Sequence, residues 1–158
     1  MFRDLVRKKQ ALPMETCLAL LKTQRRGVLS VLGDDGYPYG MPMDHWYCEA
    51  DGKLYFHGGK TGHKIDAMRA CDKVSYCVMD EGTPAEEGWW LRVCSVVVFG
   101  RVEFVADYDR AMDISRQLSY QFTRDESYIQ DEIQHSGPGT LVFALTPEHI
   151  TGKIVNER

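Results

Sequence analysis

The sequence predicts a mainly β protein, an antiparallel β-barrel of about six strands with peripheral helices. Short apolar runs recur along the 158 residues, and tight turns rather than helical crossovers join most of them. A single sheet of so few and such short strands tends to curl into a barrel. A chain of this length builds one compact domain, so we expect residues 1–158 to form a single unit.

The expected elements follow one another along the chain. Apolar residues at helical spacing begin at Met14, directly after Pro13, and the pattern stops by Gly27, which predicts the first helix. Glycine and aspartate then mark tight turns at 33–36 and 50–52. The expected strands are residues 28–32, 37–47, 53–57, 74–79 and 89–106, with a closing pair at 140–145 and 150–155. The expected later helices are residues 63–70, 108–122 and 127–135, and residues 81–88 are expected to form an acidic loop.

Three of these expectations concern irregular backbone. Pro38 and Pro42 fall within the second strand, and proline has no N–H to give to a sheet ladder. We therefore expect this strand at a sheet edge or bulged, with a gap that a ligand could use. Gly100 is expected to bend the long fifth strand, and Pro147 to separate the two closing strands.

Charge and composition narrow the function classes. The net charge of −4, from 23 acidic and 19 basic residues, is small and scattered, which disfavours a nucleic-acid partner. Charged residues interrupt each apolar run in residues 1–10, so no signal-peptide core is expected there, and no later run reaches the length of a membrane span. Five cysteines, an odd number without a C-x-x-C pair, favour reduced thiols in a cytoplasmic protein.

A glycine-rich loop, from Gly58 to Gly62, leads into the second expected helix. Such a loop presents free backbone N–H groups and the positive end of a helix dipole, which together suit a phosphate. Thr61, His63 and Lys64 add side-chain donors, and the lysine adds a full positive charge. The alternative is a flexible surface turn with solvated charges, since the loop has neither the P-loop nor the Rossmann spacing.

Histidine supplies the candidate acid–base chemistry. His57 ends the third expected strand, where its imidazole could donate to a ligand ring, transfer protons near neutral pH, or serve the fold alone. His57 and His63 are six residues apart and His45 lies on another strand. No i, i+4 zinc pair results, so we expect no metal site.

Sulfur and aromatic side chains leave two alternatives open. Met41 and Met43 flank Pro42, and their polarizable side chains suit either the face of an aromatic ring or the filling of a core. Trp89 and Trp90 could stack on a ring or contact a second subunit.

Six short motifs, taken in order, resemble those of a known family. They are Gly27-Val28-Leu29-Ser30, Gly36-Tyr37-Pro38-Tyr39 with Pro42, Tyr55-Phe56-His57, Gly62-His63-Lys64-Ile65-Asp66-Ala67, Ser95-Val96-Val97-Val98-Phe99-Gly100-Arg101-Val102 and Ile150-Thr151-Gly152-Lys153. From about Arg3 to Lys153 the sequence resembles the nitroimidazole-resistance branch of the pyridoxamine 5′-phosphate oxidase-like flavoproteins. The resemblance implies an FMN-binding split β-barrel.

The resemblance also implies a homodimer in which each FMN lies between the two subunits. The ring would lie along the strand at Met41 to Met43, and the phosphate at the helix start at His63 and Lys64. In this family a histidine matching His57 lies beside the flavin ring, and the segment matching Ser95 approaches it from the fifth strand. The cofactor-binding residues implied in this way are Met41, Pro42, Met43, Phe56, His57, Gly58, Thr61, Gly62, His63, Lys64 and Ser95, with His57 as the catalytic residue.

The implied activity is that of an FMN-dependent oxidoreductase. Electrons would pass from NAD(P)H to a small acceptor such as a nitroaromatic or a quinone. Residues 154–158 lack the basic substrate pocket of the oxidase proper, which disfavours pyridoxamine phosphate as a substrate. A flavin-binding carrier without turnover and a haem-binding member of the same barrel family are the alternatives.

Overall fold

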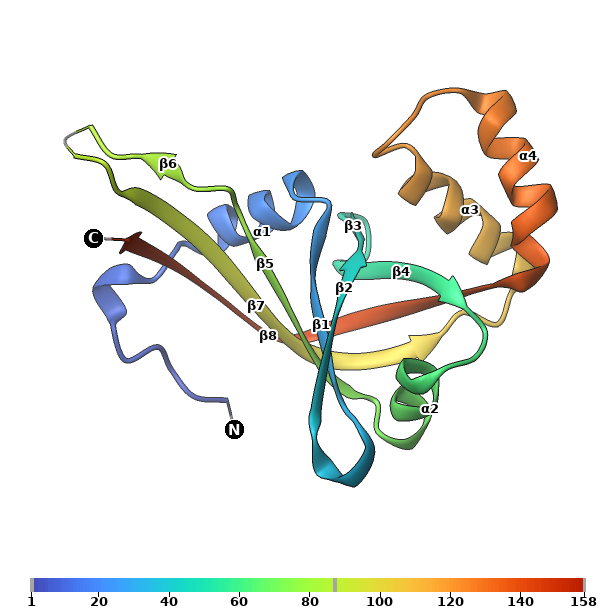
Figure 1. Ribbon diagram of the computed structural model, residues 1–158, viewed down its shortest axis with the longest axis horizontal. Helices are drawn as coiled ribbons and strands as arrows, with labels where there is room; N and C mark the ends of the chain where they lie inside the picture. Colours follow the sequence, from blue (N-terminus) through green and yellow to red (C-terminus); the bar gives the residue numbers. More distant parts are fainter. Residues whose placement is uncertain (1, 87, 158) are drawn as a thin grey trace.

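Eight strands within the described residues form one sheet, and every pairing in it is antiparallel (Figure 1). The computed structural model describes residues 2–86 and 88–157. The strands are β1 (Arg26–Leu32), β2 (Pro38–Asp44), β3 (Trp46–Cys48), β4 (Lys53–Gly59), β5 (Lys73–Met79), β6 (Thr83–Pro84), β7 (Leu91–Phe104) and β8 (Thr140–Glu157). The sheet order is β2, β1, β5, β7, β8, β4 and β3, and β6 pairs with β7 outside this path.

The curl of the sheet follows from its connectivity. β2 and β3 lie at opposite ends of the sheet order, yet His45 alone joins them in the chain. The sheet must therefore bend until its two ends approach each other, which produces a barrel. Among the described residues no ladder links β2 to β4, so the barrel is split beside β2. The split β-barrel expected from the sequence is confirmed.

Helices flank this barrel (Figure 1). They are α1 (Met14–Thr23), α2 (His63–Ala70), α3 (Tyr108–Ser119) and α4 (Glu126–Ser136), with short 3-10 turns η1 (Lys8–Gln10), η2 (Asp34–Gly36) and η3 (Gly137–Gly139). Asp107 and Asp125 cap α3 and α4, because each side chain accepts hydrogen bonds from backbone N–H groups of the first turn. α3 and α4 lie side by side at one end of the sheet, away from α1, and α2 begins as expected at His63.

The expected pair of closing strands is wrong, because β8 runs without interruption past Pro147. Its register with β7 shifts between Phe99, opposite His149, and Gly100, opposite Pro147. The extra residue forms a bulge at which the missing N–H of proline is tolerated. Gly100 is required there, since a Cβ atom would collide with the carbonyl oxygen of Thr146. The irregularity that we expected at Gly100 is confirmed.

Two other segments refine the expectations. β2 is an edge strand, as its two prolines predicted. The expected strand 37–47 is divided at His45, where the chain passes from one end of the sheet to the other. The expected acidic loop contains the two-residue strand β6, and residue 87 lies outside the described part of the chain.

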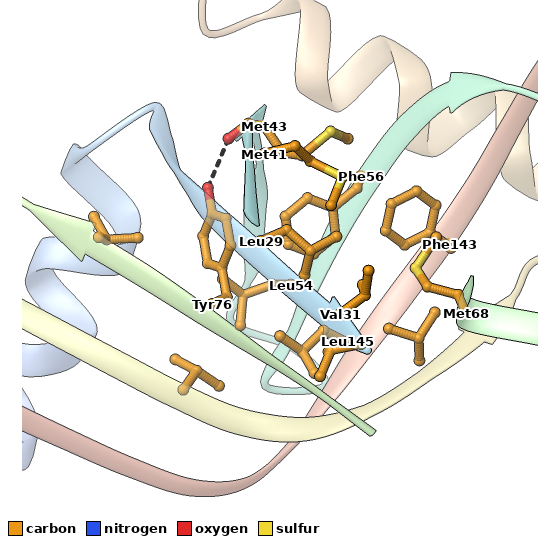
Figure 2. Close-up of a cluster of buried hydrophobic side chains, with 14 of the residues drawn as sticks. Leu29, Val31, Met41, Met43, Leu54, Phe56, Met68, Tyr76, Phe143 and Leu145 are labelled. Atoms are coloured by element: carbon orange, nitrogen blue, oxygen red, sulfur yellow. Dashed lines mark hydrogen bonds between the residues drawn. The ribbon is translucent and has the colours of Figure 1, made fainter. Parts of the chain in front are cut away.

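The main hydrophobic core fills the barrel (Figure 2). Phe56 of β4 stacks on Phe143 of β8 at 5.2 Å between ring centroids and meets Tyr76 of β5 edge-on at 4.9 Å. A smaller cluster, which includes Leu118 and Val142, packs α3 against the outer side of β4 and β8. The two clusters hold β4 from both faces.

Across the described residues no helix has the length and hydrophobicity needed to cross a membrane. The five cysteines, Cys17, Cys48, Cys71, Cys77 and Cys94, are all free thiols.

Candidate functional site

The split beside β2 contains a cavity of about 350 Å³, which we call the β2 cavity. Arg26, Pro42, Met43, Asp44 and His57 line it, so its walls come from β1, β2 and β4. Its volume falls within the range of small-molecule sites, about 300–1,000 Å³. Because β2 is an edge strand, its outer backbone groups are available to hydrogen-bond a ligand.

Side chains alternate between the two faces of β2. Met41 and Met43 are each 8% exposed and point into the core toward Phe56, as Figure 2 shows. Pro42 between them is exposed and lines the cavity. Of the two interpretations of the methionines, the structure favours core filling. Phe56 is fully buried as well, so a ligand on the outer face could reach only the backbone of these residues and the ring of Pro42.

A buried hydrogen-bond network holds the end of β2 from the core side. The Tyr76 hydroxyl donates to the carbonyl oxygen of Met43 at 2.7 Å (Figure 2) and lies 2.9 Å from Nδ1 of His45. Nε2 of His45 donates to the carbonyl oxygen of Leu21 at 2.7 Å. Gly27 makes room for this network, because a Cβ atom there would lie 2.8 Å from the Tyr76 hydroxyl. The strand that borders the cavity is therefore fixed from behind.

An ion pair that sequence reasoning missed borders the cavity. Arg26 and Asp44 face each other across the β1–β2 ladder, and their side chains form a bidentate pair at 2.6 and 3.2 Å. Counting outward from the expected turn at 33–36 would place Met43 opposite Arg26, because it pairs Leu32 with Tyr37; the observed register pairs Leu32 with Pro38 and so brings Asp44 opposite Arg26. Because the two charges neutralise each other, this ion pair adds no net charge to the cavity.

His57 lines the β2 cavity from β4, which continues two residues beyond the expected end at His57, to Gly59. It is exposed, and no described residue makes a hydrogen bond to its imidazole. The surrounding protein displaces water and lowers the pKa of His57, an effect that Asp44 opposes and Lys64 reinforces. His57 is thus a neutral imidazole near pH 7 with both nitrogens available to a ligand.

Lys64, the second residue of α2, folds back toward β2 and β4. Its Nζ atom lies 3.7 Å from Sδ of Met43, and a Cβ atom at Gly58 would lie 3.1 Å from the same Nζ. Within the described part of the chain no carboxylate reaches ion-pair distance of this half-buried ammonium. Gly58 thereby allows a positive charge without a counter-ion to sit beside the cavity.

The start of α2 is open to an anion. Gly62 precedes the helix with a φ of 119°, a backbone conformation that residues with a side chain rarely adopt. No side chain caps the first turn of the helix. The first backbone N–H groups of a helix have no acceptor within the helix itself. Thr61 is exposed in the same loop. This end of the site therefore combines backbone donors with the charge of Lys64.

His63 is turned away from Lys64, although the two residues are adjacent. Its ring stacks on Tyr39 of β2 at 4.3 Å between centroids, and its Nε2 accepts a hydrogen bond from the backbone N–H of Asp34 at 3.4 Å. Its side chain supports the β1–β2 hairpin. Of these two predicted donors at the helix start, the structure thus brings Lys64, and not the imidazole of His63, into contact with Met43, a residue that lines the β2 cavity.

Ser95 is remote from this cavity within one chain. It lies on β7, opposite Met79 and Lys153, and both β1 and β5 separate β7 from β2. Its neighbour Val96 is fully buried, so Ser95 belongs to the outer face of the sheet. Trp89, one of the two tryptophans that could stack on a ring or contact a second subunit, is 88% exposed.

A second cavity, of about 280 Å³, lies where α3, α4 and η3 meet the ends of β4 and β8; we call it the helical pocket. His57 lines both cavities, so the two adjoin at this residue. Sequence reasoning missed this pocket because it treated the two helices as peripheral. Their spacing patterns give no indication of which face would enclose a cavity.

The family model for pyridoxamine 5′-phosphate oxidase matches residues 13–154. No curated protein matches the chain. The fold resembles that of a candidate 5-nitroimidazole antibiotic resistance protein from Bacteroides thetaiotaomicron, with a TM-score of 0.78, 20% identity, and 92% and 87% of the two chains covered. A FAD-binding protein from Mesorhizobium loti has a TM-score of 0.68, 25% identity, and 92% and 97% coverage. A FAD- and haem-binding protein from Mycobacterium smegmatis has a TM-score of 0.73, 19% identity, and 92% and 73% coverage. With nine-tenths of its length matched, and with the split barrel that the resemblance implied, the chain belongs to the pyridoxamine 5′-phosphate oxidase family.

Proposed function

We propose that the chain is a flavin-dependent oxidoreductase that binds FMN in the β2 cavity. The observation that carries this proposal is the half-buried ammonium of Lys64, which has no carboxylate partner among the described residues and lies beside the uncapped start of α2. Membership of the family supports the proposal, and so do similar structures described as FAD-binding. FMN carries one phosphate, which matches the charge of one lysine better than the two phosphates of FAD do.

The chemistry of the donors fits a phosphate at one end and a planar ring at the other. Backbone N–H groups at a helix start and one lysine suit a phosphate monoester. The exposed backbone of edge strand β2, the ring of Pro42 and the free imidazole of His57 supply hydrogen bonds and an apolar surface for a ring. FMN, when bound, supplies the capacity to accept and release electrons.

The chain's own residues would orient that group and set its environment. His57, neutral near pH 7, would donate a hydrogen bond to the ring where negative charge develops on reduction. The network of Tyr76 and His45 keeps β2 in place, so that the ring meets a rigid edge. Small-molecule donors such as NAD(P)H, and acceptors such as nitroaromatics or quinones, fit an open site of this kind.

A second copy of the chain would complete the site. Val28, Met79 and Phe99 are 40%, 57% and 38% exposed on the outer face of β1, β5 and β7, where Ser95 also lies. An apolar face of this kind is typical of a subunit interface. In a homodimer that covers this face, the second copy would bring its apolar surface and its outer-face serine toward the ligand of the first copy. The free cysteines support a reducing, cytoplasmic location for this dimer.

The proposal is tested by titrating FMN into the apoprotein of Lys64→Ala, with Lys60→Ala as the matched control. Lys60 is exposed in the same glycine loop, so its loss removes an equal charge outside the cavity. Lys64→Ala should weaken FMN binding by about 1–3 kcal/mol, the range for a charge-assisted hydrogen bond. Equal dissociation constants for the two variants would contradict the phosphate site.

Catalysis needs a separate measurement. Purified protein loaded with FMN should oxidise NAD(P)H in the presence of a nitroaromatic or quinone panel, with steady-state turnover. Tight flavin binding without turnover of any compound in the panel would refute the proposed enzymatic activity and support a flavin-binding carrier.

A further inference from the structure

The helical pocket contains a polar group that the fold itself leaves without a partner. Ser115, on α3, is 7% exposed and lines the pocket, and its hydroxyl has no hydrogen-bond partner among the described residues. A buried hydroxyl without a partner costs free energy, because it has given up hydrogen bonds to water. Such a group is explained if a ligand supplies the missing hydrogen bond.

The charges of the pocket select among ligands. Its lining includes the carboxylate of Glu132 on α4 and no lysine or arginine. The Ser136 hydroxyl donates to Oε2 of Glu132 at 3.4 Å, a weak contact that leaves the carboxylate available to attract a cation. Outside the lining, the Arg25 guanidinium lies 5.4 Å from the centroid of the Phe122 ring; within the lining, an anionic ligand would meet the charge of Glu132 with no lysine or arginine to offset it.

The shape and surface of the pocket suit a small aromatic molecule. Phe122 and Tyr128 line it and are 54% and 57% exposed, so an occupant would cover two large rings that face water in the free chain. The volume, about 280 Å³, is near the lower limit for small-molecule sites. A single ring with one polar substituent fits this combination of size, rings and hydroxyl groups.

From these observations we infer that the helical pocket is the substrate pocket of the enzyme and takes an uncharged or cationic single-ring aromatic molecule that bonds to the Ser115 hydroxyl. The assignment of this molecule as the electron acceptor rests on the proposed function, since His57 lies between this pocket and the β2 cavity. Glu132 disfavours anionic acceptors. The binding itself requires neither flavin nor turnover.

The test uses three probes of nearly equal size and different charge: para-nitrobenzylamine, para-nitrobenzyl alcohol and para-nitrobenzoate. Their dissociation constants are measured by ligand-observed NMR for the wild type, Ser115→Ala and Glu132→Gln, with and without FMN. Asp131→Asn is the matched control, because Asp131 is an exposed carboxylate beside Glu132 that does not line the pocket. The amine should bind the wild type about two- to fivefold more tightly than the benzoate, and this preference should vanish in Glu132→Gln and persist in Asp131→Asn.

Ser115→Ala gives a result that a purely structural serine would not. It should weaken binding of the alcohol about two- to tenfold while raising the melting temperature of the free protein, because the unpartnered hydroxyl is removed. The inference is overturned if the benzoate binds the wild type as tightly as the amine, or if Ser115→Ala leaves the affinity for the alcohol unchanged. FMN is titrated separately into each variant; failure of the wild type to bind FMN would refute the proposed function, whereas probe binding to flavin-free protein tests the pocket alone.

Discussion

Two histidines lie near the two faces of β2, and they differ in what their rings contact. His45 is 1% exposed, and both of its nitrogens have partners, the carbonyl oxygen of Leu21 and the hydroxyl of Tyr76. His57 is exposed between two cavities and has no hydrogen-bond partner within the described residues. Loss of water lowers the pKa of both. A lowered pKa therefore does not distinguish a functional histidine from a structural one here. The distinguishing feature of His57 is an imidazole that lines a cavity and has no hydrogen-bond partner among the described residues.

The largest expected difference between the two is in stability. His45→Ala leaves the Leu21 carbonyl and one side of the Tyr76 hydroxyl without partners in the core, which should lower the free energy of unfolding by about 2–4 kcal/mol. His57→Ala removes an exposed side chain and should change it by less than about 0.5 kcal/mol. Denaturant unfolding of both variants measures this difference, and equal losses of unfolding free energy would contradict the distinction between the two histidines.

A smaller effect of His45 should appear in the pH dependence of unfolding. Burial lowers the pKa of His45 in the folded state below the ordinary 6.5, so the unfolded chain binds a proton more readily. The contribution of a neutral His45 is therefore complete above pH 6.5 and is lost as the pH falls below it, by at most about 1.4 kcal/mol per pH unit. His45→Gln should show a shallower acid slope than the wild type.

The control for this slope is His135→Gln, which replaces an exposed histidine on α4. Its slope should follow that of the wild type. If His45→Gln also keeps the full slope, the network around Tyr76 does not depend on a neutral His45.

The smallest expected effect concerns the redox potential of bound flavin. A hydrogen bond from His57 that strengthens on reduction is worth about 0.5–1.5 kcal/mol, so His57→Ala should lower the two-electron midpoint potential by about 10–30 mV. His57→Asn retains a donor and should recover part of this loss. Spectroelectrochemical titration of the three proteins measures the series, and an unchanged potential in both variants would assign His57 to a role apart from the ring.

Local chemistry predicted the elements near the site well. The prolines of β2 indicated an edge strand, because a missing N–H acts at its own position. Gly62 and the residues after it indicated the start of α2. Pro147 wrongly suggested a break between two strands, because its local chemistry does not show the bulge that accommodates it. That bulge depends on the register with Gly100, which is far away in the chain.

The positions of side chains in the site were less predictable. Met41 and Met43 left two interpretations open because periodicity alone does not say which face of an edge strand is buried. His63 and Lys64 were both expected to donate to a phosphate, but His63 stacks on Tyr39 whereas Lys64 reaches Met43. The pocket around Ser115 depends on how α3 and α4 pack together, which no local pattern encodes.

The central claim is that flavin lies on the outer face of β2, against His57 and away from His45. NMR spectra of the imidazole ring protons, assigned with the His45 and His57 variants, test it directly during titration of the apoprotein with FMN. The His57 resonances should shift in proportion to FMN bound while those of His45 stay fixed. FMN binding, followed by quenching of its fluorescence, that leaves the His57 resonances unmoved would contradict the claim.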